Sequence, residues 1–224
     1  MTLTNQKNYF INTDNNLLQL SRLFIQLFPV MNKLEQQLAL NLYQQLALGK
    51  PVLIALIADN INQNYIVINN IIHSWPGVFF DESNHVIGFW GLTINETPHK
   101  IIVNNITVYT WCAWDTLFIP ELLNQKSSIY STCPVTKEKI NLELSPNDVK
   151  STNKKDIVVS FLKPDLNDLN NIITNFCHFV FFFSNRTAGE QWCAENNNTF
   201  LLTLDDAFRV GKKINATRYN YAQL

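Results

Sequence analysis

The spacing of apolar residues changes near residue 95, and this change constrains the possible folds more than any other feature of the sequence. Before that point the apolar residues recur as they do on one face of a helix. After it they mostly alternate with polar residues, as in strands with one buried face. The sequence therefore predicts an α+β protein. The helices expected in the first part span residues 17–27, 34–48, 51–58 and 65–74.

The second part, residues 96–224, is expected to form a core domain of antiparallel or mixed sheet with flanking helices. Two short apolar runs flank Asn104-Asn105, which predicts a hairpin with a tight turn. Thr187-x-x-Glu190 matches a capping box, which would open a short helix through Ala194. Further strands are expected at residues 127–131, 140–144, 157–162, 177–183 and 201–204, and further helices at residues 112–123, 164–176 and 205–218.

Residues 1–95 have the layout of a winged-helix module, because short helices precede a hairpin expected at residues 78–80 and 86–92. Such a module binds DNA in some proteins and only packs against a neighbouring domain in others. Basic residues in this region are fewer than acidic ones, and residues 65–74 contain no Lys or Arg to contact phosphates. We therefore expect a winged-helix-like N-terminal domain that does not bind DNA.

The composition argues against nucleic-acid and membrane partners. The formal net charge is −1, from 17 Lys and Arg residues against 18 Asp and Glu residues, so the chain lacks the basic character of a general nucleic-acid binder. No run approaches the roughly 20 apolar residues that span a bilayer. The apolar residues 17–31 lack the basic leader and the cleavage site of a signal peptide. We expect a cytoplasmic protein.

The spacing of the four cysteines excludes the simplest metal and redox motifs. Cys112, Cys133, Cys177 and Cys193 form no Cys-x-x-Cys pair, so zinc-ribbon and thioredoxin-like sites are not expected. In a reducing compartment these thiols stay unpaired, and each is either a buried hydrophobic group or a reactive one. For Cys133 and Cys193 we favour packing.

The segment from Tyr109 to Leu117 joins a predicted strand to a predicted helix and contains Cys112 and Asp115. Three positions apart in a first helical turn, these two side chains share a face. A helix N-terminus lowers the pKa of a thiol, and a carboxylate beside the thiol can accept its proton or deliver one nearby. The simpler alternative is a buried cysteine followed by a carboxylate that only begins a helix.

Cys177 lies in the most apolar run of the chain, from Phe176 to Phe183. A cysteine in such a run is most often a core residue. Alternatively it is a second soft ligand that faces Cys112 across the core, because two thiolates suit a thiophilic cation such as Hg²⁺. The residues alone leave both alternatives open.

Several short segments, in order along the chain, match one enzyme family. They are Gly49-Lys50-Pro51-Val52, Gly91-Leu92-Thr93 with Glu96-Thr97, Tyr109-x-Trp111-Cys112-Ala113-x-Asp115-Thr116-Leu117, Ser131-x-Cys133, Leu144-Ser145-Pro146, and Phe176-Cys177-His178 followed by Phe182-Phe183. From about residue 30 to the C-terminus the chain resembles the alkylmercury lyases, also called organomercurial lyases. The resemblance implies a winged-helix-like N-terminal part before an α+β catalytic core.

The resemblance also implies a catalytic trio of Cys112, Asp115 and Cys177 and a structural role for Cys133. The implied reaction, a mercury detoxification, is protonolysis of a carbon–mercury bond, in which R–Hg⁺ and H⁺ give R–H and Hg²⁺. The two cysteines as thiolates, together with Asp115, would bind the substrate and product mercury, and Asp115 would also carry the proton. No cofactor or resident metal is implied. Low-molecular-weight thiols would release the Hg²⁺, and a mercuric reductase is a candidate recipient.

A second function stays open at this point, namely a relative that binds a thiophilic metal for sensing or sequestration without cleaving the carbon–mercury bond. Both functions need the same thiols, so the cysteines do not separate them. Asp115 favours the enzyme, because a pure metal trap needs no positioned carboxyl group.

Overall fold

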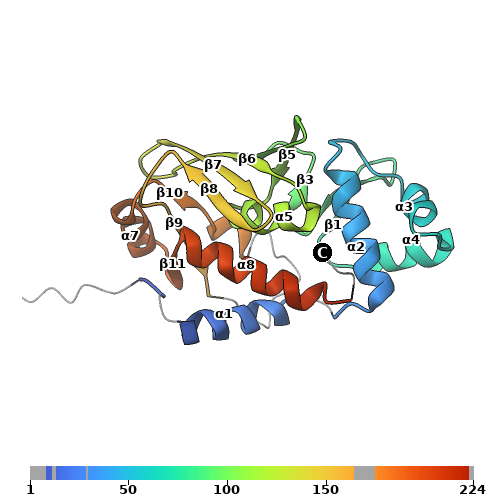
Figure 1. The fold of residues 1–224 in the computed structure, drawn as a ribbon, viewed down its shortest axis with the longest axis horizontal. Coiled ribbons are helices and arrows are strands. Elements are labelled where there is room, and N and C mark those ends of the chain that lie inside the picture. The colour runs from blue at the N-terminus through green and yellow to red at the C-terminus, as the bar shows by residue number, and fades with distance from the viewer. Residues whose placement is uncertain (1–8, 12–13, 29, 164–174, 222–224) are drawn as a thin grey trace, which may run out of the picture.

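An antiparallel sheet of eight strands, in the order β1-β2-β3-β5-β4-β6-β7-β8, is the largest element of the structure (Figure 1). This computed structural model describes residues 9–11, 14–28, 30–163 and 175–221. A smaller antiparallel sheet has the order β10-β9-β11. The strands are β1 (Val78–Phe80), β2 (Val86–Phe89), β3 (Leu92–Thr93), β4 (His99–Val103), β5 (Ile106–Thr110), β6 (Ser127–Thr132), β7 (Lys139–Ser145), β8 (Asp148–Thr152), β9 (Val158–Leu162), β10 (Phe182–Phe183) and β11 (Thr199–Thr203).

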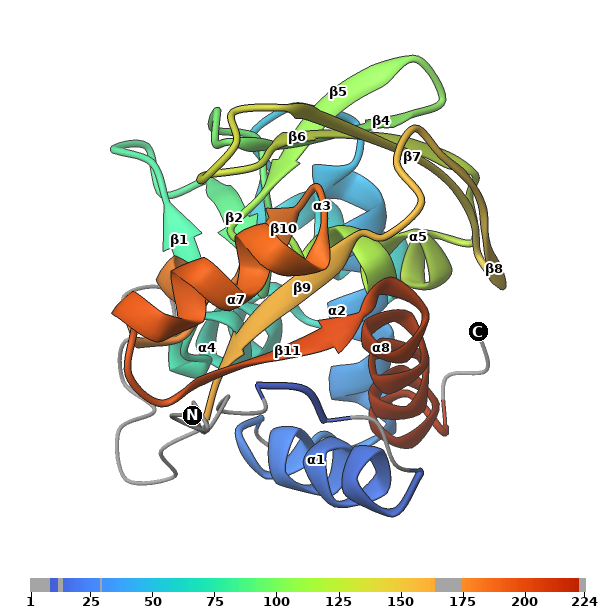
Figure 2. The same ribbon diagram turned by 90° about the vertical axis from the view of Figure 1, so that its left-hand side faces the viewer.

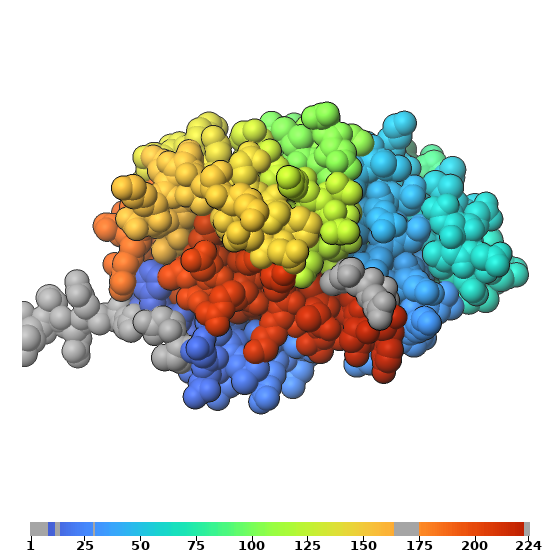
Figure 3. Space-filling model, in the orientation of Figure 1, coloured from blue at the N-terminus to red at the C-terminus, as the bar shows by residue number. Residues whose placement is uncertain are grey.

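Helices flank both sheets, which confirms the predicted α+β class. They are α1 (Asp14–Gln26), α2 (Lys33–Leu46), α3 (Ile54–Asn60), α4 (Tyr65–Ser74), α5 (Asp115–Leu123), α7 (Arg186–Glu195) and α8 (Leu204–Arg218). Helices α1 and α8, from opposite ends of the chain, lie side by side (Figures 1 and 2). In the space-filling view, α8 in red lies between α1 in blue and the β7–β8 region in yellow (Figure 3). Among the described residues, no helix is long and apolar enough to cross a membrane.

Local sequence explains several element boundaries. The Asn32 side chain accepts the Glu35 N–H, and the Glu35 side chain accepts the Asn32 N–H, so a reciprocal capping box begins α2. Gly49, at a φ of 71°, follows α2 in the left-handed conformation that ends helices. Asn104 and Asn105 adopt φ values of 50° and 62°, which a two-residue hairpin turn requires, and they join β4 to β5 as predicted.

Two local predictions are wrong, and one lies outside the described residues. Asn185, not Thr187, caps α7, because the Asn185 side chain accepts the Ala188 N–H at 2.9 Å. Residues 177–183 do not form one strand; a 3₁₀ helix, η1 (Cys177–Phe179), precedes β10. The sequence pattern does not predict strand β8, whose residues are mostly exposed and so lack an alternating apolar face. The helix predicted over residues 164–176 falls almost entirely on residues 164–174, which the structure does not describe.

The large sheet runs across the boundary predicted between residues 95 and 96. Strand β3 pairs with β2 on one side and with β5 on the other, so the hairpin β1–β2 continues into the sheet of the second part. Helices α2, α3 and α4 and the hairpin do follow one another in the order of a winged-helix module. The division into residues 1–95 and 96–224, and the likeness to a winged helix, stay predictions.

Candidate active site

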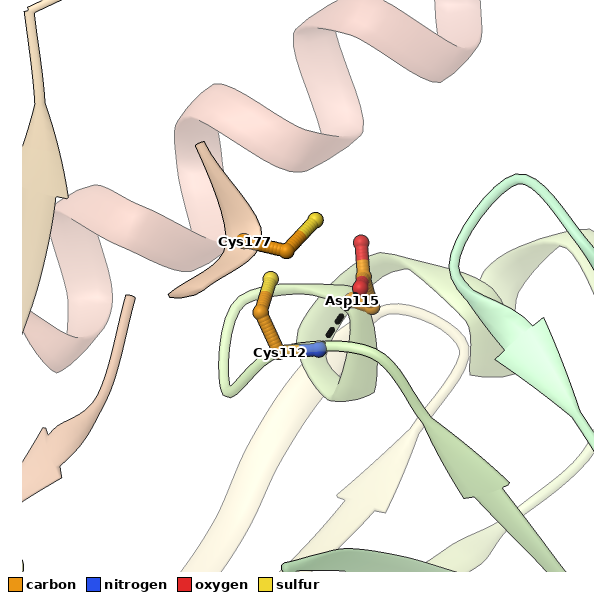
Figure 4. A group of neighbouring side chains, drawn as sticks. All are labelled: Cys112, Asp115 and Cys177. Atoms are coloured by element: carbon orange, nitrogen blue, oxygen red, sulfur yellow. Dashed lines mark hydrogen bonds between the residues drawn. The ribbon is translucent and has the colours of Figure 1, made fainter. Parts of the chain in front are cut away.

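Cys112 and Asp115 lie where β5 turns into α5. Asp115 is the first residue of α5, and its Oδ2 accepts the backbone N–H of Cys112 at 3.0 Å. The Thr110 hydroxyl at the end of β5 donates to the Cys112 carbonyl at 2.9 Å. Cys112 therefore precedes the helix instead of lying in its first turn. The hydrogen bond to Asp115 still turns both side chains to the same side of the backbone (Figure 4).

Cys177 reaches the same place from a distant part of the chain, on the 3₁₀ helix η1. The Ala113 N–H donates to the Val180 carbonyl at 3.1 Å, which joins the Cys112 loop to the segment after η1. The Ser160 hydroxyl on β9 donates to the Phe179 carbonyl at 2.8 Å. Cys177 and His178 lie on the 3₁₀ helix η1 and not on a strand, where adjacent side chains would point to opposite faces. Cys177 is nevertheless buried and the adjacent His178 exposed.

The three predicted site residues come together in one buried cluster. The sulfurs of Cys112 and Cys177 and a carboxylate oxygen of Asp115 all lie within 4.8 Å of one another. Figure 4 shows the three side chains pointing toward a common centre. Cys112 is 0% exposed, and Asp115 and Cys177 are each 6% exposed. Two soft sulfurs with one oxygen form a donor set suited to a thiophilic cation.

Burial sets the protonation of this cluster. It raises the pKa of Asp115 to about 7, although hydrogen bonds from Cys112 act in the opposite direction. Near neutral pH the carboxyl group is therefore present in both its protonated and its ionised form. Such a group can both accept and donate a proton, which is what general acid–base chemistry requires.

The predicted lowering of the Cys112 pKa is wrong. Burial raises it well above the ordinary value, and the hydrogen bond to Cys177 and the charge of Asp115 raise it further. A hydrogen bond from Cys112 lowers the pKa of Cys177, but burial and the charge of Asp115 outweigh it, so that pKa is raised as well. The helix dipole does not prevail, because Cys112 lies outside α5 in a fully desolvated position. At neutral pH both cysteines are therefore thiols, and ligation of a metal ion must remove their protons.

Comparison with known proteins identifies the family. Residues 92–216 match the family model described as MerB, alkylmercury lyase. The alkylmercury lyase of Bacillus cereus is 36% identical over 178 residues, which cover 80% of each chain. That of Pseudomonas putida is 31% identical over 177 residues, 79% of this chain and 82% of the relative. The chain belongs to the alkylmercury lyase family.

A solved structure shares the fold of this alkylmercury lyase family member. It is described as the mercury-bound form of MerB2, and it superposes with a TM-score of 0.70. The match covers 92% of this chain and 98% of the other, at 19% sequence identity. The order of helices and strands described above is therefore a fold that is already known among solved structures.

The other two cysteines of this alkylmercury lyase family member lie outside the cluster. The Cys133 sulfur accepts the Thr136 N–H at 3.4 Å. Burial acts to raise the Cys133 pKa, but hydrogen bonds from Thr136 and its neighbours lower it overall. Cys193 is buried on α7, and burial raises its pKa. Within the described part of the chain, neither thiol belongs to a group of side chains that could hold a metal ion.

Trp114 connects the site to the core of the protein, a role that the sequence did not reveal. Its indole N–H donates to the Ala207 carbonyl of α8 at 2.9 Å. Its ring lies 5.0 Å from that of Phe24 on α1 and 5.3 Å from that of Phe161 on β9. Trp114, directly before Asp115, thus anchors the start of α5 to three other elements.

Gly91 is a further site residue that the sequence did not single out, although it lies in the family segment Gly91-Leu92-Thr93. It has a φ of 97°, and a Cβ atom built there would lie 2.6 Å from Cγ of Asp115. The backbone of the β2–β3 turn therefore lies directly against the carboxyl group. Only the spatial arrangement reveals this contact, because Gly91 is distant from Asp115 in sequence.

Proposed function

We propose that this protein is an organomercurial lyase that cleaves carbon–mercury bonds by protonolysis at Cys112, Cys177 and Asp115. The observation that carries the proposal is the buried cluster itself, in which two sulfurs and one carboxylate oxygen lie within 4.8 Å of one another. Membership of the alkylmercury lyase family supports the reaction type. The raised pKa of Asp115 supports its assignment as the proton carrier.

The proposed reaction consumes both thiol protons, one on the leaving carbon and one on Asp115. One thiol binds the mercury of R–Hg⁺ as a thiolate, and its proton passes to the ionised Asp115. The second thiol then binds the same mercury and also gives up its proton. One of these two protons protonates the carbon, the carbon–mercury bond breaks, and R–H leaves. Hg²⁺ stays on two thiolates, and the remaining proton stays on Asp115.

The chemistry of the residues explains why two sulfurs are needed. Each thiolate donates electron density to mercury, so the attached carbon becomes basic enough to accept a proton. Burial strengthens these interactions, because little water surrounds the cluster to screen them. The carboxyl group can return the proton because its pKa is close to neutral pH.

Turnover should require a thiol in solution and no added metal. Hg²⁺ held by two protein sulfurs dissociates slowly unless a competing thiol replaces the protein ligands one at a time. We therefore expect repeated turnover only with excess low-molecular-weight thiol, and no loss of activity after dialysis against EDTA. Loss of activity in EDTA with recovery on addition of zinc would contradict the proposal, which assigns no resident metal.

The direct test is incubation of the purified protein with phenylmercury and excess thiol, followed by measurement of benzene. Benzene release at a rate proportional to enzyme concentration is the expected result. The competing function is a metal-binding relative used for sensing or sequestration. That function predicts tight binding of mercury by the protein with no benzene above the rate in a protein-free control.

The proposed setting is the cytoplasm, where a reducing environment maintains thiols such as the four unpaired cysteines of this chain. Low-molecular-weight thiols are abundant there and would carry Hg²⁺ away from the site. A mercuric reductase is the proposed final recipient, since the released ion stays toxic until it is reduced.

A further inference from the structure

Gly91 and the Asp115 side chain lie so close together that a side chain at position 91 would clash with the carboxyl group. A Cβ atom at Gly91 would lie 2.6 Å from Cγ, 2.7 Å from Oδ1 and 3.0 Å from Cβ of Asp115. The other carboxyl oxygen, Oδ2, accepts the Cys112 N–H. One oxygen of Asp115 is thus held by a hydrogen bond, and the other lies against the bare backbone of the β2–β3 turn.

The turn that carries Gly91 is strained and held at several points. Trp90 has a φ of 38°, which is unfavourable for a bulky residue. The Tyr43 hydroxyl on α2 donates to the Trp90 carbonyl at 2.8 Å, and the Trp90 N–H donates to the Gly77 carbonyl at 3.1 Å. The Trp111 N–H donates to the Gly91 carbonyl at 2.9 Å. Strain of this kind persists only where the surroundings over-determine the backbone, and it concentrates at functional sites.

Arg218, at the end of α8, covers the Trp90 ring. Its guanidinium carbon lies 4.3 Å from the centroid of that ring and 3.9 Å from the centroid of the Phe28 ring. Arg218 is only 8% exposed, and its Nε and Nη2 have no hydrogen-bond partner among the described residues. A buried guanidinium that stacks on aromatic rings gains cation–π energy and fixes the orientation of those rings.

Arg218 and Asp115 both affect the pKa of the Tyr43 hydroxyl, which donates to the Trp90 carbonyl. Burial raises the Tyr43 pKa most, Tyr219 raises it further, Arg218 lowers it, and Asp115 raises it. Within the described residues, the charge of Asp115 also raises the pKa values of Cys112 and Cys177. Arg218 and the carboxyl group thus lie within electrostatic reach of one anchor of the turn.

We propose that the Trp90–Gly91 turn is a positioning element, which presses the Asp115 carboxyl group toward the two sulfurs and shields it from water, and that Arg218 holds this turn through the Trp90 ring. Gly91, Trp90 and Arg218 are positioning residues, because they act on the substrate only through Asp115. The inference rests on the proposed function, since it concerns the proton that Asp115 carries.

The first test is Gly91→Ala, with Gly88→Ala on β2 as the matched control. The added methyl at Gly88 meets neighbours no closer than 3.4 Å, so that variant should behave as wild type. Gly91→Ala should displace the carboxyl group, and a misplacement of about 1 Å lowers kcat by roughly 10²-fold. Both cysteines remain in this variant, so each folded molecule should still bind one Hg²⁺. The bound Hg²⁺ is counted by mass spectrometry, and rates are expressed per Hg²⁺-binding site.

The pH profile separates positioning from a merely structural role. A displaced, hydrated carboxyl group should shift the apparent pKa in kcat/KM from near 7 toward 3.8, the ordinary value for aspartate. A purely structural role would lower the number of active sites and leave kcat per site and the profile unchanged. Full kcat per site with an unmoved profile in Gly91→Ala would overturn the proposal.

The Arg218 variants keep the test decisive if Gly91→Ala does not fold. Arg218→Leu should lower kcat per site about tenfold, as loss of an outer-shell partner typically does, with unchanged Hg²⁺ stoichiometry. Arg218→Lys retains the charge and should restore part of the rate. Wild-type kcat and pH profile in Arg218→Leu would overturn the role of Arg218. A wild-type enzyme that releases no hydrocarbon would instead contradict the proposed function, so the two failures are distinguishable.

Discussion

Cys112→Ser and Cys177→Ser should each abolish hydrocarbon release, with a fall in rate of at least about 10⁴-fold, the scale seen when one member of a cooperating catalytic group is removed. A serine hydroxyl is a poor ligand for a soft cation, and a single thiolate activates the mercury-bound carbon too weakly. Both variants should still fold, because the change replaces one buried atom by a slightly smaller one. Gas chromatography of the headspace after addition of methylmercury measures the loss directly.

Cys133→Ser and Cys193→Ser provide matched controls for this prediction. Both side chains are buried thiols, so the chemical change is the same, but neither lies in the cluster. We expect normal turnover and a loss of about 1–3 kcal/mol in the free energy of unfolding, the usual cost of burying a poorly paired hydroxyl. Full turnover by Cys177→Ser, together with near-zero turnover by Cys193→Ser, would show that Cys193 supplies the second sulfur.

Asp115→Asn should bind the organomercurial through both cysteines and yet release hydrocarbon far more slowly than wild type. Asparagine has nearly the same shape, so a cavity cannot explain the loss, but its amide neither accepts a thiol proton nor protonates carbon. Removal of a general acid–base group typically costs about 10² to 10⁴ in rate. Mass spectrometry of the methylmercury adduct, with methane measured in parallel, reads binding and cleavage separately. Methane at the wild-type rate would leave Asp115 only a structural role.

The same variant should be more stable than wild type at neutral and higher pH. The folded-state pKa of Asp115 is raised from 3.8 to about 7, so the stability that its protonated form provides is complete below pH 3.8 and is lost as pH rises through 7. At about 1.4 kcal/mol per pKa unit, this loss reaches about 4 kcal/mol by pH 8, and asparagine avoids it.

Urea unfolding of wild type and Asp115→Asn at pH 5 and pH 8 measures the pH-dependent difference in stability. Asp59→Asn, on the exposed side of α3, controls for the chemical change itself. A stability difference that stays constant between the two pH values would contradict the raised pKa. The expected result is an enzyme in which the proton carrier costs stability and is retained for catalysis.

Hydrophobic spacing and turn residues predicted much of the fold, because they act within a few positions of the chain. Helix α4 begins at Tyr65 and ends at Ser74 as expected, and the turn at Asn104-Asn105 joins β4 to β5. The errors arose where a tertiary contact decides the local conformation. The segment after Cys177 has the composition of a buried strand, but its hydrogen bonds with Ser160 and with Ala113 hold it as a 3₁₀ helix followed by a short strand.

The identities of the clustered residues could be predicted, but their electrostatics could not. Family segments pointed to Cys112, Asp115 and Cys177, and the structure brings all three together. The raised pKa of Cys112 depends on complete burial and on the hydrogen bond to the distant Cys177 as well as on Asp115, and a helix-start pattern contains only Asp115. The role of Gly91 could not be predicted for the same reason, since its contact with Asp115 exists only after the large sheet has formed.

The two sulfurs come from segments that are far apart in sequence and meet only in the folded chain. An ion bonded to both would therefore act as a cross-link that closes the loop from residue 112 to residue 177. A covalent link over loops of such length restricts the unfolded chain by about 3–5 kcal/mol in the chain-entropy view. The free energy of unfolding would then be higher in the Hg²⁺ product complex than in the free protein. A thiol that displaces one of the two sulfurs would break this cross-link as well as begin the release of Hg²⁺.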